Sequence, residues 1–133
     1  MPLLNVKLSA KPDPVTTKSV AELLTGLTNS ILKKRREVTA VQVEYIPQGQ
    51  WFIGGMEAAA SVKPTFSLDI KVTSGTNTKD EMREYLVAVF TGMQKILGTV
   101  DEASYIVIHE LRADSWGFGG LTQEHRYIHG KII

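Results

Sequence analysis

The residue with the clearest chemical potential is Pro2. Methionine is normally removed before a small residue such as proline, and its removal would give Pro2 a free secondary amine. The α-amino groups of model peptides have a pKa of about 8, and burial or nearby cations lower it further because both disfavour the charged form. Pro2 is therefore predicted to act as a neutral general base. If Met1 stays attached, the nitrogen of Pro2 is an amide and cannot act as a base.

Two other groups of side chains could bind ligands. His125 and His129 are four residues apart, which would put both imidazoles on one face of a helix as metal ligands. No third ligand is evident, so we expect surface or interface histidines and no metal. The cationic run 33–36 (KKRR) lies where a predicted helix ends, and there its charges would complement the helix dipole and stay solvated. Binding of an anionic substrate by one of these cations is the alternative.

The chain contains an internal repeat. Segment 51–55 (WFIGG) recurs as segment 116–120 (WGFGG), at an offset of 116 − 51 = 65 residues. Apolar and polar residues alternate in segments 3–9 and 66–72, as expected for half-buried strands. These features predict one domain, residues 1–133, that is built of two repeats at about 2–60 and 64–125.

A helix and a second strand are predicted to follow the first strand of each repeat. Asp13-Pro14 is a typical helix start, and that helix should end near Arg36. In the second repeat, Thr78 and Glu81 match a capping box and Gly98 is a natural stop. The closing strands are expected at 40–46 and 105–111.

The predicted architecture is therefore an α+β fold of two tandem βαβ units, which form a four-stranded sheet with both helices on one face. The other face has no helix to cover it. Residues 105–108 (YIVI) are apolar on both sides of their strand. Because such a face needs burial, we expect the chain to form an oligomer.

Composition excludes several classes of protein. The 133 residues suit one domain, and their hydrophobic fraction of 43% and charged fraction of 22% are ordinary for a globular protein. The net charge is 15 − 14 = +1, which argues against nucleic acid as a partner. The chain has no cysteine, and hence no disulfide, thiolate zinc site or thiol nucleophile. No apolar stretch approaches the roughly 20 residues of a membrane span, and no signal-peptide pattern is present, so we expect a cytoplasmic protein without membrane partners.

Taken together, Pro2 before a βαβ unit, segment 49–55 (GQWFIGG) and the 65-residue duplication resemble the tautomerase superfamily. That group includes 4-oxalocrotonate tautomerase, 5-carboxymethyl-2-hydroxymuconate isomerase, malonate semialdehyde decarboxylase and macrophage migration inhibitory factor. The resemblance covers almost the whole chain. It implies a homotrimer with active sites at the subunit boundaries and no cofactor. It also implies that Pro2 moves a proton between an enol hydroxyl and a carbon atom.

The resemblance assigns further site residues. The pocket aromatic of the family falls on Trp51 in the first repeat and on Trp116 in the second. The substrate-orienting arginine of the closing strand falls on Gln42 and on Tyr105, respectively. Tyr105 also falls where the cytokine-like branch has a pocket tyrosine from a neighbouring subunit, and there it would polarise the substrate carbonyl.

Two cations are candidates for holding the substrate carboxylate. Lys34 lies near the pocket lysine of the cytokine-like branch, and Lys11 lies near the first-loop arginine of the 4-oxalocrotonate branch. The resemblance therefore implies a substrate-binding role for one of these lysines, in addition to Gln42, Trp51 and Trp116.

Departures from the family pattern narrow the expected reaction. The paired arginines of the decarboxylase and the haloacrylate dehalogenases are absent from segment 72–78 (VTSGTNT). We therefore expect a cofactor-independent keto–enol tautomerase that acts on a 2-oxo acid or its enol. Because Gln42 and Tyr105 replace arginine, a monoanionic or aromatic 2-oxo acid suits the site better than a dicarboxylate. The alternatives are a non-catalytic trimeric scaffold for binding or signalling, and a hydratase, dehalogenase or decarboxylase of the same family.

Overall fold

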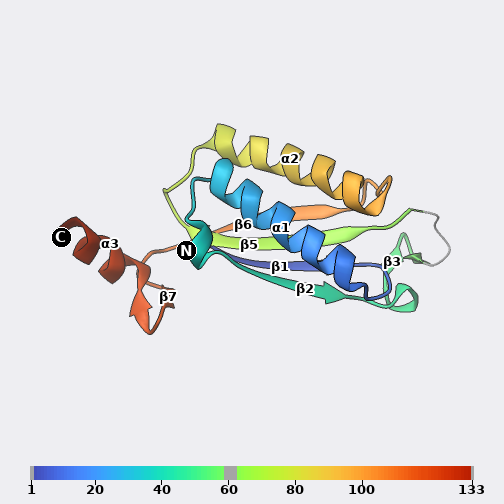
Figure 1. Cartoon of the computed structure of the whole chain (residues 1–133), viewed down its shortest axis with the longest axis horizontal. Coiled ribbons are helices and arrows are strands. Elements are labelled where there is room, and N and C mark those ends of the chain that lie inside the picture. Colours follow the sequence, from blue (N-terminus) through green and yellow to red (C-terminus); the bar gives the residue numbers. More distant parts are fainter. Residues whose placement is uncertain (1, 59–62, 133) are drawn as a thin grey trace.

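The computed structural model of the chain describes residues 2–58 and 63–132. Its main elements are a four-stranded sheet and two long helices (Figure 1). The strands of this sheet are β1 (Leu3–Leu8), β2 (Ala40–Tyr45), β5 (Phe66–Thr73) and β6 (Tyr105–Leu111), and the helices are α1 (Pro14–Ser30) and α2 (Lys79–Leu97). None of the helices in the described part of the chain combines the length and the apolar character needed to cross a membrane.

The order of the strands in the sheet is β2-β1-β5-β6. β1 pairs with β2 in parallel, and β5 pairs with β6 in parallel, whereas the central pair β1 and β5 is antiparallel. A helix connects the two strands of each parallel pair, α1 in the first half and α2 in the second. The predicted α+β fold of two tandem βαβ units is confirmed.

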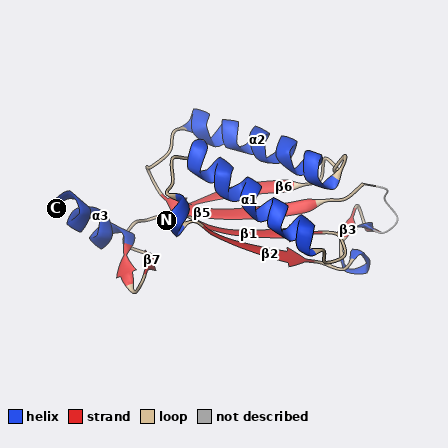
Figure 2. Cartoon of the chain, in the orientation of Figure 1, coloured by secondary structure: helices blue, strands red, loops and turns tan. Residues whose placement is uncertain are grey.

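Both helices lie on the same face of the sheet (Figure 2). The core between the two layers consists of alternate residues of the central strands and of one side of each helix, as the periods of strand and helix require. Its fully buried members include Leu4, Val6, Leu8, Val20, Leu24, Phe66, Leu68, Ile70, Tyr85, Val89 and Met93. The hydroxyl groups of Thr28 and Tyr85 are 2.9 Å apart and share a hydrogen bond, which satisfies both within this core.

The predicted helix starts are confirmed. The side chain of Asp13 accepts a hydrogen bond from a backbone N–H of the first turn of α1, and Pro14 opens that helix. At α2, Thr78 and Glu81 form both hydrogen bonds of the capping box. Gly98 ends α2 with a φ of 87°, a conformation that favours glycine.

The predicted end of α1 near Arg36 is wrong, because the helix stops at Ser30. The chain then turns Leu32 into the core, where it is 1% exposed, and Lys33 adopts a left-handed conformation with φ of 61°. Segment 33–36 therefore lies in a loop that leads into the short helix η1 (Arg36–Val38). Although the run lies beyond the helix, Nζ of Lys33 donates a hydrogen bond of 2.8 Å to the carbonyl oxygen of Ser30, the last residue of α1, so this cation complements the dipole of α1 as expected.

The two glycine-rich segments form short hairpins. The first joins β3 (Phe52–Ile53) to β4 (Met56–Glu57) after the short helix η2 (Gln48–Gln50), and the second joins β7 (Gly117–Phe118) to β8 (Leu121–Thr122). Each turn consists of two glycines with positive φ, as a two-residue hairpin turn of this kind requires. A helix that we did not predict, α3 (Gln123–Ile132), follows the second hairpin and extends past the end of the sheet (Figure 1).

The helix-free face of the sheet is mostly polar, and this differs from the apolar face that we expected. A hollow on this face is lined by Leu3 and by polar residues of all four strands, namely Asn5, Lys7, Gln42, Glu44, Asp69, Lys71 and His109. The Nε2 of His109 lies 2.7 Å from Oδ1 of Asp69. Exposed apolar side chains occur on the edge strand β6, where Tyr105 and Val107 are 65% and 43% exposed. The apolar argument for oligomerisation therefore applies to that edge and not to the whole face.

Candidate active site

The strand directions divide the predicted site residues between two edges of the sheet. β1 runs antiparallel to β5, with Leu3 opposite Lys71 and Leu8 opposite Phe66. The sheet has two ends along the direction of its strands. We call the end where β1 and β2 begin and β5 and β6 end the Pro2 edge, and the opposite end the Tyr105 edge. β1 has 6 residues. At about 3.3 Å per residue, the two edges are roughly 20 Å apart.

Pro2 is buried directly before β1. Its carbonyl oxygen accepts a hydrogen bond of 3.2 Å from the backbone N–H of Ala40, which holds Pro2 against the start of β2. Continued by one residue, the register of β1 and β5 places Pro2 opposite Val72, which is 1% exposed. Aliphatic surroundings solvate an ammonium poorly and so favour the neutral form of an amine. Met1 lies outside the described residues.

A cavity of about 670 Å³, which we call the basic cavity, lies at the Pro2 edge. It is partly open to solvent and is bordered mainly by the loop after α1, the loop after β5 and the start of α3. Its lining residues are Lys33, Lys34, Arg35, Val38, Thr73, Ser74, Gly75, Thr76, Ala113, Gln123, Glu124, Arg126 and Tyr127. Four of these residues are cationic and one is a carboxylate, a formal charge of 4 − 1 = +3. Pro2 does not line the cavity, but Val38 and Thr73 do. Val38 lies two residues before Ala40, which is hydrogen-bonded to Pro2, and Thr73 directly follows Val72.

Lys34 is held in a fixed position in the basic cavity. Its Nζ donates a hydrogen bond of 2.7 Å to Oγ1 of Thr76, which in turn donates one of 2.6 Å to the carbonyl oxygen of Thr73. Partial burial lowers the pKa of Lys34, while attraction to Glu81 and Glu110 opposes this shift. The ammonium group of Lys34 is thus incompletely solvated. An anion bound in the cavity would stabilise the charged form of this lysine and so replace part of the missing hydration.

The third wall of the basic cavity comes from residues that sequence reasoning missed. Gln123 and Arg126 are three residues apart, on one side of α3, and both line the cavity. The guanidinium carbon of Arg126 lies 4.5 Å from the ring centroid of Phe118, a cation–π contact that orients the group. In the sequence, the only sign of this wall is the i, i+3 spacing of Gln123 and Arg126 after the second glycine pair. That spacing places two side chains together only if the segment is a helix, which we did not predict.

Trp116 is at the Pro2 edge. It follows the end of β6 and is half-buried. Its carbonyl oxygen accepts a hydrogen bond of 3.0 Å from the backbone N–H of Gln123, which closes the second hairpin and sets the start of α3. Trp116 therefore positions a wall of the basic cavity without lining it.

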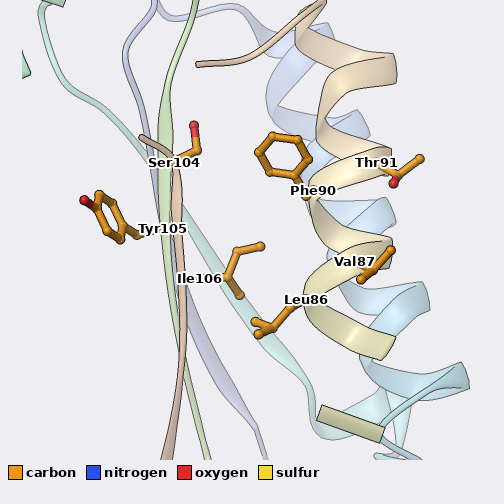
Figure 3. A pocket seen from close by; sticks show the side chains of 7 residues that line it. All are labelled: Leu86, Val87, Phe90, Thr91, Ser104, Tyr105 and Ile106. Carbon is orange, nitrogen blue, oxygen red and sulfur yellow. The ribbon is translucent and has the colours of Figure 1, made fainter. Parts of the chain in front are cut away.

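Tyr105 lies at the opposite edge. It begins β6 opposite Ser67, is 65% exposed and borders a separate hollow with Leu86, Val87 and Phe90 of α2. Figure 3 shows Ile106 pointing toward α2, whereas Tyr105 points to the other side of β6. Pro2 and Tyr105 of one chain are therefore not brought together, and a site that contains both needs two chains.

The remaining predicted residues also lie outside the basic cavity. Lys11 is exposed in the loop after β1, at the Tyr105 edge. Trp51 is half-buried at the same edge, and its carbonyl oxygen accepts a hydrogen bond of 2.7 Å from the N–H of Ala58. Gln42 is opposite Asn5 in the sheet and lines the hollow of the helix-free face. Within one chain, the structure brings Pro2, Lys34 and Trp116 to the same edge and leaves the other four apart from them.

The two histidines that were considered as metal ligands are exposed on α3. The ring centroids of His125 and His129 are 4.0 Å apart. Among residues 2–58 and 63–132, no group of three or more histidine, aspartate or glutamate side chains is arranged to hold a metal ion.

The sequence comparison finds a family in the second half of the chain. Residues 67–126 match the model of the tautomerase enzyme family. Among curated protein sequences, none matches the chain significantly.

Solved structures share the fold of the whole chain. A native fused 4-OT has a TM-score of 0.83 at 22% identity and covers 92% of this chain and 97% of its own. A fused 4-OT described as a wild-type asymmetric trimer has a TM-score of 0.82 at 15% identity, covering 93% and 98%. The protein Pt0534, solved after inactivation by 2-oxo-3-pentynoate, has a TM-score of 0.82 at 10% identity, also covering 93% and 98%.

Both lines of comparison agree with the two βαβ units and with the duplication read from the sequence. The family match covers the second unit, and the fold match extends over both. Residues 67–126 are therefore similar to the tautomerase enzyme family, and the chain as a whole has the fold of the fused 4-OT structures, with two tandem βαβ units.

Proposed function

We propose that this protein is a cofactor-independent keto–enol tautomerase that acts on a 2-oxo acid or its enol, with Pro2 as the general acid and base. The observation that carries the proposal is the placement of Pro2. It is buried before β1, opposite an aliphatic residue and beside a cavity with a formal charge of 4 − 1 = +3. A terminal amine is needed to accept a proton there, and cations are needed to bind an organic acid.

The reaction requires one group that accepts and then donates a proton. After removal of Met1, the neutral nitrogen of Pro2 takes the proton from the enol hydroxyl of the substrate. The O–H electron pair forms the carbonyl at C2, and the electrons of the C2–C3 double bond take the proton back from Pro2 at C3. The net change is isomerisation, and no other reactant enters the balance.

The substrate carboxylate would be held by Lys34, which lines the basic cavity at the Pro2 edge. Lys11 lies at the other edge of its own chain, so it would reach this site only from a neighbouring chain. Tyr105, which would polarise the carbonyl, and Trp51 would also reach this site only from a neighbouring chain. Similar structures include wild-type trimers of fused 4-OT. We therefore include in the proposal a homotrimer whose sites lie at subunit boundaries, with Trp116 helping to exclude water from the Pro2 edge.

The first test is ketonisation of phenylenolpyruvate by protein whose intact mass shows that Met1 is gone. Pro2→Ala keeps a primary terminal amine but loses the ring, and we expect a loss of at least tenfold in kcat/KM. A second control adds one uncleaved residue before Pro2, which keeps the ring and converts its nitrogen to an amide. This variant is expected to be inactive, because an amide nitrogen cannot accept the proton.

A covalent probe tests the same nitrogen independently of turnover. One protein of this fold was inactivated by 2-oxo-3-pentynoate. A secondary amine adds readily to such an activated alkyne, so we expect one adduct per chain, located at Pro2 by peptide mapping. Equal ketonisation by all three proteins, or none by any of them, together with no adduct at Pro2, would remove the base from the mechanism. The fold would then serve as a non-catalytic scaffold for binding.

A further inference from the structure

The second hairpin and α3 contain buried hydrogen-bond donors without acceptors. Among the described residues, four buried side-chain nitrogen or oxygen atoms have no hydrogen-bond partner. Three of these four are nitrogen donors in this part of the chain, Nε1 of Trp116, Nε2 of Gln123 and Nη1 of Arg126. Buried polar atoms of folded proteins are almost always satisfied, so such a group of donors needs an explanation.

Two of these donors belong to residues that line the basic cavity. Gln123 is 8% exposed, so its side chain is more than nine-tenths buried. Arg126 is half-buried, and its guanidinium group is placed by the ring of Phe118 at 4.5 Å. The amide of Gln123 and the guanidinium of Arg126 thus belong to two residues that line the same cavity, and each has a buried nitrogen without an acceptor.

The surroundings of these donors favour an anion over a neutral ligand. The opposite wall contributes Lys33, Lys34 and Arg35, whereas Glu124 is the one carboxylate among the residues that line the cavity. A carboxylate offers two acceptor oxygens, which can accept from a guanidinium and an amide at once. The sequence lacks an arginine at the closing-strand positions 42 and 105, and α3 provides one from another element.

We propose that Gln123 and Arg126 of α3, together with Lys34, form the site that binds the carboxylate of the organic-acid substrate. This inference rests on the proposed function for the identity of the substrate, but the binding site is testable without turnover. α3 would then determine specificity, selecting acids over the corresponding esters or amides.

The test uses the probe 3-phenylpropanoate, which has a carboxylate but no 2-oxo group and so cannot react. Its dissociation constant is measured by titration calorimetry for the wild-type chain, with 3-phenylpropanamide as the uncharged counterpart. We expect Arg126→Met to weaken binding of the acid at least tenfold, and Gln123→Glu to weaken it similarly while keeping the size of the side chain. The affinity for the amide should stay within twofold. Arg83→Met, an exposed arginine of α2, is the matched control and should leave both affinities unchanged.

Kinetics and oligomeric state complete the test. For phenylenolpyruvate we expect Arg126→Met to raise KM with little change in kcat, and Arg126→Lys to restore part of the loss because it keeps the charge without the planar fork. If ketonisation does not depend on Pro2 but Arg126→Met still weakens binding of the acid, the proposed function fails and the carboxylate site stands. Wild-type affinity in Arg126→Met and Gln123→Glu would overturn the site. Loss of the oligomer at unchanged affinity would also overturn it, because the donors would then serve an interface between chains.

Discussion

Thr65 precedes β5 in the same way that Pro2 precedes β1, so the two residues occupy equivalent positions at opposite edges of the sheet. Their chemistry differs. Thr65 is fully buried, its backbone N–H donates a hydrogen bond of 2.9 Å to Oγ of Ser9, and its hydroxyl donates one of 2.8 Å to the carbonyl oxygen of Ala103. The backbone nitrogen of Thr65 is an amide that is already paired. The duplicated fold therefore has two equivalent edges, and at the second the nitrogen equivalent to that of Pro2 is a hydrogen-bonded amide.

The first prediction separates these edges. Thr65→Val keeps the branched shape that suits a strand but leaves the carbonyl of Ala103 without its donor. Because this oxygen accepts from a buried hydroxyl, we expect the free energy of unfolding to fall by about 1–3 kcal/mol. The value of kcat should not change, since the base lies at the other edge. Urea denaturation and phenylenolpyruvate ketonisation measure the two quantities. A loss of kcat comparable to that of Pro2→Ala would contradict a single base per chain.

The second prediction concerns the hydroxyl pair between the helices. Burial raises the pKa of Tyr85 to about 12, although the hydrogen bond with Thr28 acts in the opposite direction. The folded-state pKa exceeds the ordinary value of 10. The contribution of Tyr85 to stability is therefore fully present below pH 10 and is lost as the pH rises from 10 toward 12.

Tyr85→Phe leaves Thr28 without a partner and should cost about 1–2 kcal/mol of stability at neutral pH. The same variant should show a shallower loss of stability above pH 10 than the wild type does. Denaturation at several alkaline pH values, combined with an ultraviolet titration of tyrosinate, tests both statements. An unchanged alkaline slope would mean that another group dominates unfolding at high pH.

The third prediction concerns Lys34. Burial lowers its pKa in the folded state, so the unfolded chain binds the proton more tightly. The resulting penalty is fully present below the folded-state pKa and disappears as the pH rises toward the ordinary value of 10.5. Lys34→Met removes the penalty together with the charge. We therefore expect KM for phenylenolpyruvate to rise at least tenfold, while the free energy of unfolding stays within about 0.5 kcal/mol of the wild-type value.

The pH dependence of KM offers a second readout for Lys34. In the wild type, KM should rise on the alkaline side at a lower pH than an ordinary lysine would give, because the charge that holds the carboxylate is lost earlier. Lys18→Met, an exposed lysine on α1, is the matched control and should change neither KM nor its pH profile. A wild-type KM in Lys34→Met would exclude this lysine from binding the substrate.

Much of the fold could be predicted because its signals are local. The alternating strands, the cap at Asp13, the capping box at Thr78 and Glu81 and the stop at Gly98 each depend on neighbouring residues, and the structure contains all of them. The duplication then set the topology, because two equal βαβ units can share one sheet. The placement of Pro2 at the start of β1 followed from the same reading.

The failures came from tertiary context. The end of α1 depends on the packing of Leu32 into a core that no local pattern shows. The polar character of the helix-free face comes from side chains of all four strands, such as Lys7 and Asp69, whereas our expectation used β6 alone. The separation of Pro2 from Tyr105 is a consequence of the antiparallel pairing of β1 with β5, which the linear alignment of the repeats does not contain. α3 was missed because it is short and mostly exposed, with little of the apolar pattern that marks a core helix.

The last prediction tests how the second hairpin positions α3. A Cβ atom added at Gly117 would overlap the carbonyl group of Leu121, a backbone group that cannot turn aside as a side chain does. In the first hairpin the equivalent position is occupied by Phe52, so this requirement for glycine belongs to the second hairpin. Gly117→Ala should therefore separate β7 from β8 and break the hydrogen bond between Trp116 and Gln123.

The consequence should appear in binding and not in the core. The second hairpin and α3 extend beyond the sheet (Figure 1), so we expect the free energy of unfolding of Gly117→Ala to change by less than about 1 kcal/mol. Its affinity for 3-phenylpropanoate should fall at least tenfold, as in Arg126→Met, because both donors leave the basic cavity together. Gly49→Ala is the matched control, since a Cβ at that position meets no atom within 4 Å. If Gly117→Ala binds the acid as the wild type does, this hairpin is not what holds α3 in place.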